Sequence, residues 1–132
     1  MEVLLVEPGK EARIAEIGND LKSLQAAVGG YIEAIYPFYD PVALVCNDEG
    51  KIMQMPLNRA LRGEDGKIYD AIAGSFFICG LGEDNFCSLP KDLQAKYLEK
   101  FRWPEKFLAI GGNLVAVQDR PSEAAHKPAP ER

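Results

Sequence analysis

The sequence predicts an α+β fold: a β-grasp-like mixed sheet with two main helices packed on one of its faces. Short runs of apolar and β-branched residues, bounded by Gly, Pro and Asn, predict strands. Two longer segments, with apolar residues four positions apart, predict amphipathic helices. Strands come before, between and after these helices, which favours one α+β sheet within a chain of 132 residues.

The chain opens with a predicted hairpin followed by a helix. Residues 2–7 form an apolar run that predicts a buried strand, and residues 12–17 are expected to return beside it. Residues 18–20 break the strand and offer an N-cap, and apolar positions at helical spacing predict a helix over 21–28. The glycines at 29–30 end it, because glycine tolerates the left-handed conformation.

A meander and a long loop are predicted next. Residues 31–36 and 42–47 are rich in β-branched, aromatic and other apolar residues and are expected to pair as a hairpin. A tight turn then leads into a third strand over 51–55. Residues 57–70 are polar and predict a loop with one helical turn at 57–61; loops of this length are often functional.

The C-terminal part contains the clearest helical pattern. After a strand over 71–79, residues 89–101 carry an apolar stripe opposed by charged residues, with Ser88 as the expected cap. A short turn over 105–108 and a last strand over 113–118 are expected to follow.

The predicted domain comprises residues 1–118. From residue 119 to 132 Pro, Ala, Glu and Lys dominate without apolar periodicity, so this C-terminal tail is predicted to be disordered.

Composition excludes several classes of partner. The net charge of −5 disfavours direct binding to nucleic acid, which depends on clustered Lys and Arg. The apolar runs are far too short to cross a bilayer, so we expect no membrane insertion. No secretory signal is recognisable, which predicts a cytoplasmic protein. The three cysteines lack CxxC spacing and are expected to be reduced thiols.

The sequence does not predict an enzyme. Acyl-transfer chemistry usually needs a positioned base, and the one histidine, His126, lies in the predicted tail. Three scattered cysteines make a poor zinc site, and the acidic pairs Glu64-Asp65 and Glu83-Asp84 lack EF-hand spacing, so we expect a solvated acidic surface rather than a metal site. No cofactor is expected.

Polar groups at the 42–47 hairpin and in the following loop are the best candidates for a binding site. Asn offers a donor and an acceptor to a base or amide edge, Lys and Arg suit phosphate, and Tyr can stack. The alternative is an ordinary turn with surface charges and core aromatic residues. The candidate ligand-binding residues are Asn47, Lys51, Asn58, Arg59, Tyr36 and Tyr31.

Three segments carry a resemblance to a known family. Residues 24–33 (LQAAVGGYIE), 45–51 (VCNDEGK) and 56–60 (PLNRA) together are similar to the domain-of-unknown-function family numbered 3846, over the chain from Glu2 to about Gly82. The resemblance implies no enzymatic activity. It implies a small accessory protein of phages and other bacterial mobile elements.

That setting leads to two expectations of function. The first is a non-enzymatic protein that sequesters a small nucleotide-derived immune signal without turnover, as a homo-oligomer in the cytoplasm of a bacterial host. The second is an acidic protein-interaction module that inhibits a host defence protein.

Overall fold

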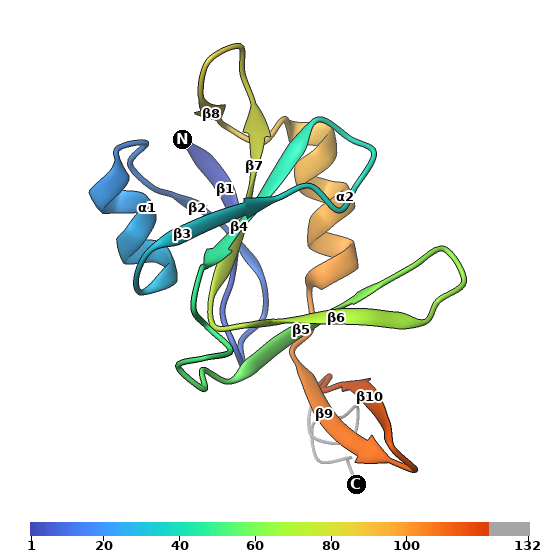
Figure 1. Ribbon diagram of the computed structural model, residues 1–132. Coiled ribbons are helices and arrows are strands. Elements are labelled where there is room, and N and C mark those ends of the chain that lie inside the picture. The colour runs from blue at the N-terminus through green and yellow to red at the C-terminus, as the bar shows by residue number, and fades with distance from the viewer. Residues whose placement is uncertain (122–132) are drawn as a thin grey trace, which may run out of the picture.

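The fold is built around a central antiparallel sheet (Figure 1). The computed structural model describes residues 1–121. The first half of the chain contains β1 (Glu2–Val6), β2 (Arg13–Glu16), α1 (Leu21–Val28), β3 (Ile32–Ile35), β4 (Val42–Asn47) and β5 (Leu57–Arg62). The second half contains β6 (Ile68–Ala73), β7 (Phe76–Leu81), β8 (Phe86–Cys87), α2 (Lys91–Phe101), β9 (Glu105–Ile110) and β10 (Asn113–Gln118).

The strand order of the main sheet is β2-β1-β7-β4-β3, with β8 paired to the end of β7. The predicted α+β class and the predicted β1–β2 and β3–β4 hairpins are confirmed. Every strand pair in the described residues is antiparallel, so the expected mixture of parallel and antiparallel pairs is wrong. β5–β6 and β9–β10 form two separate hairpins.

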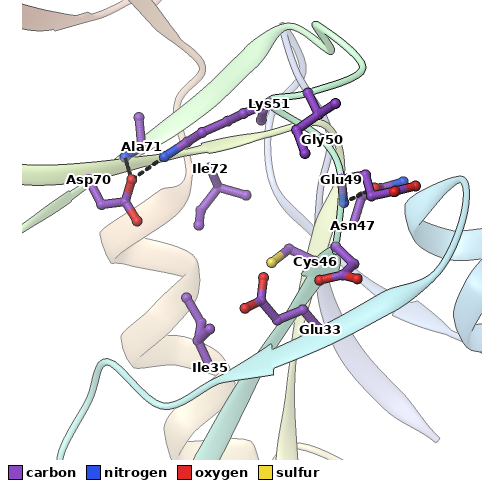
Figure 2. Close-up of a pocket in the computed structure, with 13 residues that line it drawn as sticks. Glu33, Ile35, Cys46, Asn47, Glu49, Gly50, Lys51, Asp70, Ala71 and Ile72 are labelled. Atoms are coloured by element: carbon purple, nitrogen blue, oxygen red, sulfur yellow. Dashed lines mark hydrogen bonds and ion pairs between the residues drawn. The ribbon is translucent and has the colours of Figure 1, made fainter.

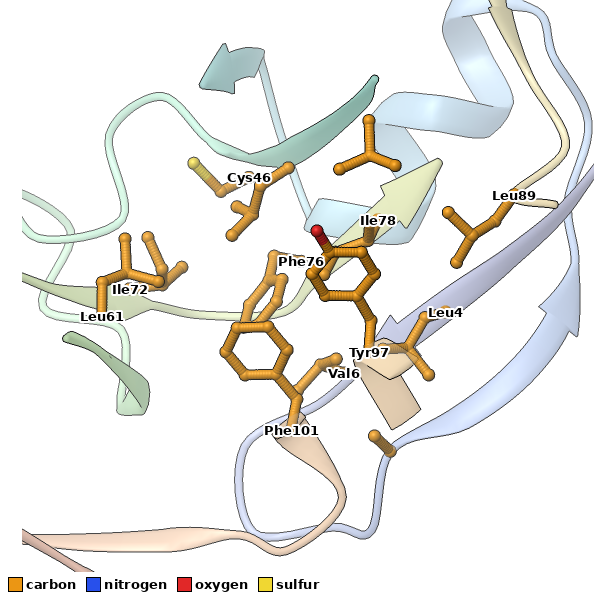
Figure 3. Close-up of a cluster of buried hydrophobic side chains, with 13 residues drawn as sticks. Leu4, Val6, Cys46, Leu61, Ile72, Phe76, Ile78, Leu89, Tyr97 and Phe101 are labelled. Carbon is orange, nitrogen blue, oxygen red and sulfur yellow. The ribbon is translucent and has the colours of Figure 1, made fainter. Parts of the chain in front are cut away.

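The two helices lie against opposite faces of this sheet, not on one face as expected. Because neighbouring side chains of a strand point to opposite faces, Leu4 and Val6 of β1 pack in the cluster that contains Tyr97 of α2 (Figure 3), whereas Val3 and Leu5 pack in the cluster that contains Leu24 of α1. The central strands are therefore buried on both sides, which explains their continuous apolar runs.

The helix signals in the sequence are partly confirmed. In α1 the Asp20 carboxylate accepts a hydrogen bond from Ser23 N–H, and Gly29 ends the helix at φ 78°, as predicted. The cap expected of Ser88 in α2 is wrong: Pro90 is the N-cap residue and makes no side-chain cap, and Ser88 Oγ instead accepts a hydrogen bond from Glu2 N–H at 2.9 Å. Ser88 thus ties the segment before α2 to the first strand.

Four of the predicted elements are wrong. The single strand expected over 71–79 is divided between β6 and β7, because residues 74–75 interrupt it. Residues 51–55 form a turn after β4 instead of a strand. The expected loop over 57–70 is the β5–β6 hairpin, with a loop only between Arg62 and Ile68, and the turn expected over 105–108 belongs to strand β9. Of the predicted tail over 119–132, residues 122–132 lie outside the part of the chain that the structure describes. In residues 1–121, no helix has the length and apolar character that a membrane crossing requires.

Asp40, which is partly exposed, connects the β3–β4 loop to α2. Its Oδ2 accepts hydrogen bonds from Tyr97 OH and Lys96 Nζ, each at 2.6 Å, and these bonds hold the pKa of the Asp40 carboxyl below its usual value. Tyr97 is only 1% exposed. The connection fixes the loop that follows β3.

We expect Asp40→Asn to make stability less sensitive to acid. A carboxyl with a lowered pKa in the folded state contributes stability above its unfolded pKa and loses it as the pH falls through the folded value. The melting temperature of the parent protein should therefore fall more steeply between pH 6 and pH 3 than that of the variant. Asp84→Asn, in the exposed β7–β8 turn, should keep the parental slope; equal slopes for parent and Asp40→Asn would contradict this role.

Candidate functional site

The candidate site is a hollow of about 190 Å³ between β3, β4, the 48–54 turn and β6, called here the acidic hollow (Figure 2). It lies where the main sheet meets the β5–β6 hairpin. Its lining residues are Glu33, Ile35, Cys46, Asn47, Asp48, Glu49, Gly50, Lys51, Ile52, Asp70, Ala71, Ile72 and Ala73.

Strand pairing brings the walls of the acidic hollow together. Glu33 of β3 is the register partner of Cys46 of β4, so both side chains share one sheet face, and Ile35 follows two positions later on that face. Ile72 of β6 packs in the same apolar cluster as Cys46 and Ile35. The inner surface is therefore apolar, and carboxylates stand around it (Figure 2).

The 48–54 turn is held firmly in place. The Asn47 side chain, 6% exposed, donates to Val28 O at 3.1 Å and accepts from Glu49 N–H at 2.7 Å. Gly50 packs directly on β6, where a Cβ atom would lie 2.5 Å from the carbonyl oxygen of Ala73. The residues that face the hollow from this turn are thus fixed to both neighbouring elements.

Negative charge dominates the acidic hollow. Four lining residues are carboxylates, Glu33, Asp48, Glu49 and Asp70, and Lys51 is the one cation among them. Lys51 Nζ already pairs with Asp70 Oδ1 at 2.5 Å. Burial raises the pKa of Asp70, but hydrogen bonds from Lys51 and Ala71 N–H and the charge of Lys51 outweigh it, so this pKa is lowered. The site therefore favours a positively charged group.

The Cys46 thiol lies at the inner end of the acidic hollow and is 5% exposed. Burial raises its pKa to about 11, with further contributions from the carboxylates of Glu33, Asp48 and Asp70. Because the thiolate is the nucleophilic form, this thiol is protonated and unreactive at neutral pH. It serves as a small apolar wall.

Four of the six candidates predicted from the sequence lie in or beside this region, and three of these four, Lys51, Tyr31 and Tyr36, are exposed. Asn47 and Lys51 line the acidic hollow. Tyr31, 70% exposed, lines an adjoining hollow of about 260 Å³ that shares Asn47 and Glu49 with the first. Tyr36 is also exposed, just after β3, but does not line the acidic hollow. Asn47 uses its amide to hold the turn, so it is a positioning residue.

The assignment of Asn58 and Arg59 to a ligand site is corrected by their burial. Asn58 is 1% exposed and donates to Val6 O and Gly74 O, both at 2.9 Å. Arg59 is fully buried; its guanidinium donates to Phe101 O at 2.9 Å, Lys10 O at 2.7 Å and Asn58 Oδ1 at 2.9 Å. Their polar groups satisfy interior acceptors and cannot reach a phosphate.

The sequence reasoning missed the residues that oppose the 48–54 turn: Glu33, Ile35, Cys46, Asp70 and Ile72. Alternation along the predicted β3–β4 hairpin contained the signal for the first three, because it places Glu33 beside Cys46. Asp70 and Ile72 could not be placed while residues 57–70 were taken for a loop. In residues 1–121, no group of three or more His, Cys, Asp or Glu side chains is arranged to hold a metal ion.

A family model described as "Domain of unknown function (DUF3846)" matches residues 1–102, which include every element of the acidic hollow and end just after α2. The β9–β10 hairpin lies beyond the matched region. No curated protein and no solved structure matches the chain.

Proposed function

Because the chain belongs to the DUF3846 family, whose description gives no activity, we propose its function from the geometry of the site: a non-catalytic binding module that holds a positively charged side chain of a partner protein in the acidic hollow. The observation that carries the proposal is the combination of four carboxylates and one already paired cation around an apolar inner surface.

Lysine and arginine side chains fit this combination. Both have an aliphatic stem that packs on an apolar surface and a charged head group that pairs with carboxylates. Ile35, Ile72 and Cys46 would contact the stem, and Glu33 and Asp48 would pair with the head. The unreactive state of the Cys46 thiol supports binding rather than turnover.

The size of the acidic hollow supports a single side chain as its occupant. Pockets for drug-sized molecules usually span about 300–1,000 Å³. The acidic hollow measures about 190 Å³, and the adjoining hollow next to Tyr31 about 260 Å³. A partner protein would place one side chain in each of these hollows and cover the exposed turn between them.

Sequestration of a nucleotide-derived signal stays a prediction, and the charges do not favour it. A phosphate would approach four carboxylates, and Arg59, one of the two cations expected to neutralise it, is in the interior. The β-grasp-like topology, the phage or mobile-element setting, the cytoplasmic location and the homo-oligomer likewise stay predictions. In that setting the partner would be a basic host defence protein.

The test is a binding titration with matched probes. Fluorescence anisotropy of labelled hexalysine should show binding, whereas labelled hexaglutamate should not bind. Glu33→Gln should weaken hexalysine binding by about three- to tenfold, the effect of losing one charge-assisted pair. Glu83→Gln, a control in the distant β7–β8 turn, should leave the affinity unchanged.

Two outcomes would contradict the proposal. Hexalysine binding that is equally strong in Glu33→Gln and in the parent would mean that the acidic hollow does not hold the cation. Saturable binding of ADP-ribose or a cyclic dinucleotide in place of hexalysine would favour the sequestration function instead.

A further inference from the structure

The outer edge of β3 is open. β3 ends the strand order of the main sheet, so in the described part of the chain no strand pairs with its outer side. Asp48 N–H donates to Tyr31 O at 2.8 Å, and bonded pairs alternate along an antiparallel ladder, so Glu33 and Ile35 bond to β4. The backbone N–H and C=O groups of Ile32 and Ala34 therefore point outward and are available to another strand.

This edge contains neither a proline nor a bulge within the strand. Native edge strands often carry Pro, inward-pointing charges or bulges that prevent the addition of a further strand. β3 has regular register with β4 over all four residues, and its one charge, Glu33, lies on the face of the acidic hollow. Two exposed aromatic residues flank it: Tyr31 at one end and Tyr36 at the other, 70% and 60% exposed.

We propose that the partner contributes an extended basic segment that adds to the outer edge of β3 as a further strand, with every second side chain a Lys or Arg facing the acidic hollow. An added strand lies about 4.8 Å from its neighbour, and its alternate side chains share one face. A Lys or Arg opposite Glu33 thus reaches the hollow, while main-chain hydrogen bonds to Ile32 and Ala34 supply affinity. This inference rests on the proposed function and adds the backbone conformation and spacing of the partner.

Charge complementarity selects this occupant over a second copy of the chain. Two β3 strands paired about a two-fold axis would bring Glu33 close to its own symmetry mate, and like charges in facing strands are destabilising. The net charge of −5 adds to this repulsion. A basic segment at the same edge would instead be attracted by the carboxylates of the acidic hollow.

The test compares two peptides of identical composition, acetyl-KTKTKTK-amide and acetyl-KKKKTTT-amide. Only the first places lysines on one face of a strand, so it should bind about tenfold more tightly in a fluorescence titration. Amide hydrogen exchange at Ile32 and Ala34, followed by NMR, should slow by at least about tenfold when it binds, as new hydrogen bonds form. N-methylation of the threonines of this peptide, whose N–H groups would bond to β3, should lower its affinity to that of acetyl-KKKKTTT-amide.

A protein variant gives an independent measurement. Ala34→Pro removes an outward N–H and leaves the bonds to β4 and the carboxylates of the hollow in place, because Pro is tolerated at edge strands. It should bind the alternating peptide about tenfold more weakly, to the level of the block peptide. Equal affinities of the two lysine peptides for the parent protein, with unchanged exchange at Ile32 and Ala34, would overturn strand addition and leave the proposed function intact. If neither peptide binds better than its glutamate counterpart, the proposed function itself fails.

Discussion

Replacing Arg59 with methionine is expected to lower the free energy of unfolding by about 3–5 kcal/mol, the cost of breaking a buried charged network on one side. Methionine fills similar space but offers no donor. The carbonyl oxygens of Phe101 and Lys10 and the side-chain oxygen of Asn58 would then be left without their partner in the interior. Burial lowers the pKa of Arg59 to about 10, so the guanidinium is charged at neutral pH.

Urea denaturation of the parent protein and of Arg59→Met measures this loss. Arg13→Met is the matched control, because Arg13 is half exposed and pairs with Glu7 at the surface, where such pairs contribute at most about 1 kcal/mol. A similar, small loss in both variants would mean that the Arg59 network does not stabilise the fold.

Truncating either of two neighbouring phenylalanines on β7 is expected to cost about 3–5 kcal/mol. Phe76 and Phe77 are both fully buried, but they point to opposite faces of the sheet. Phe76 meets the ring of Phe101 in α2 edge to face, with centroids 5.6 Å apart, whereas Phe77 packs in the cluster that holds α1. Phe76→Ala and Phe77→Ala should therefore be comparably destabilising.

This pair of variants tests the two-sided sheet directly. A sheet covered on one face only, as the sequence predicted, would lose much stability from one of the two changes and little from the other. Thermal and urea unfolding distinguish these outcomes, and Phe86→Ala, at the partly exposed β8, should cost clearly less than either. A strong asymmetry between Phe76 and Phe77 would contradict the packing described above.

The sequence predicted the elements that show either a continuous apolar run, as in β1 and β4, or apolar residues at helical spacing, as in α1 and α2. β1, α1, the β3–β4 hairpin and α2 all have such patterns, and their bounds agree with the structure to within a few residues. β5 was missed because Asn58 and Arg59 are polar and were assigned to the surface. Their burial depends on carbonyl acceptors contributed by β1, the loop after it and the end of α2, which no local pattern reveals.

The candidate site was also predicted only in part, because tertiary packing, which no local pattern reveals, positions some of its residues. Asn47 and Lys51 were identified because turn chemistry is local, and both line the acidic hollow. Asp70 comes from a hairpin that was taken for a loop, and its position opposite Lys51 is set by tertiary packing. The charge of the site therefore differs from the expected one. Lys51 and Arg59 were expected to bind a phosphate, but Arg59 is buried in the interior and Lys51 is already paired with Asp70.

The hydrogen bonds of Arg59 also limit when the protein can fold during its synthesis. Its guanidinium joins Lys10 near the start of the chain to Phe101 at the end of α2, and β1 cannot pair with β7 until residues 76–78 have been made. Such distant pairings make folding slow relative to helical proteins. During synthesis on the ribosome, the complete sheet and the Arg59 network can therefore form only after α2 has emerged.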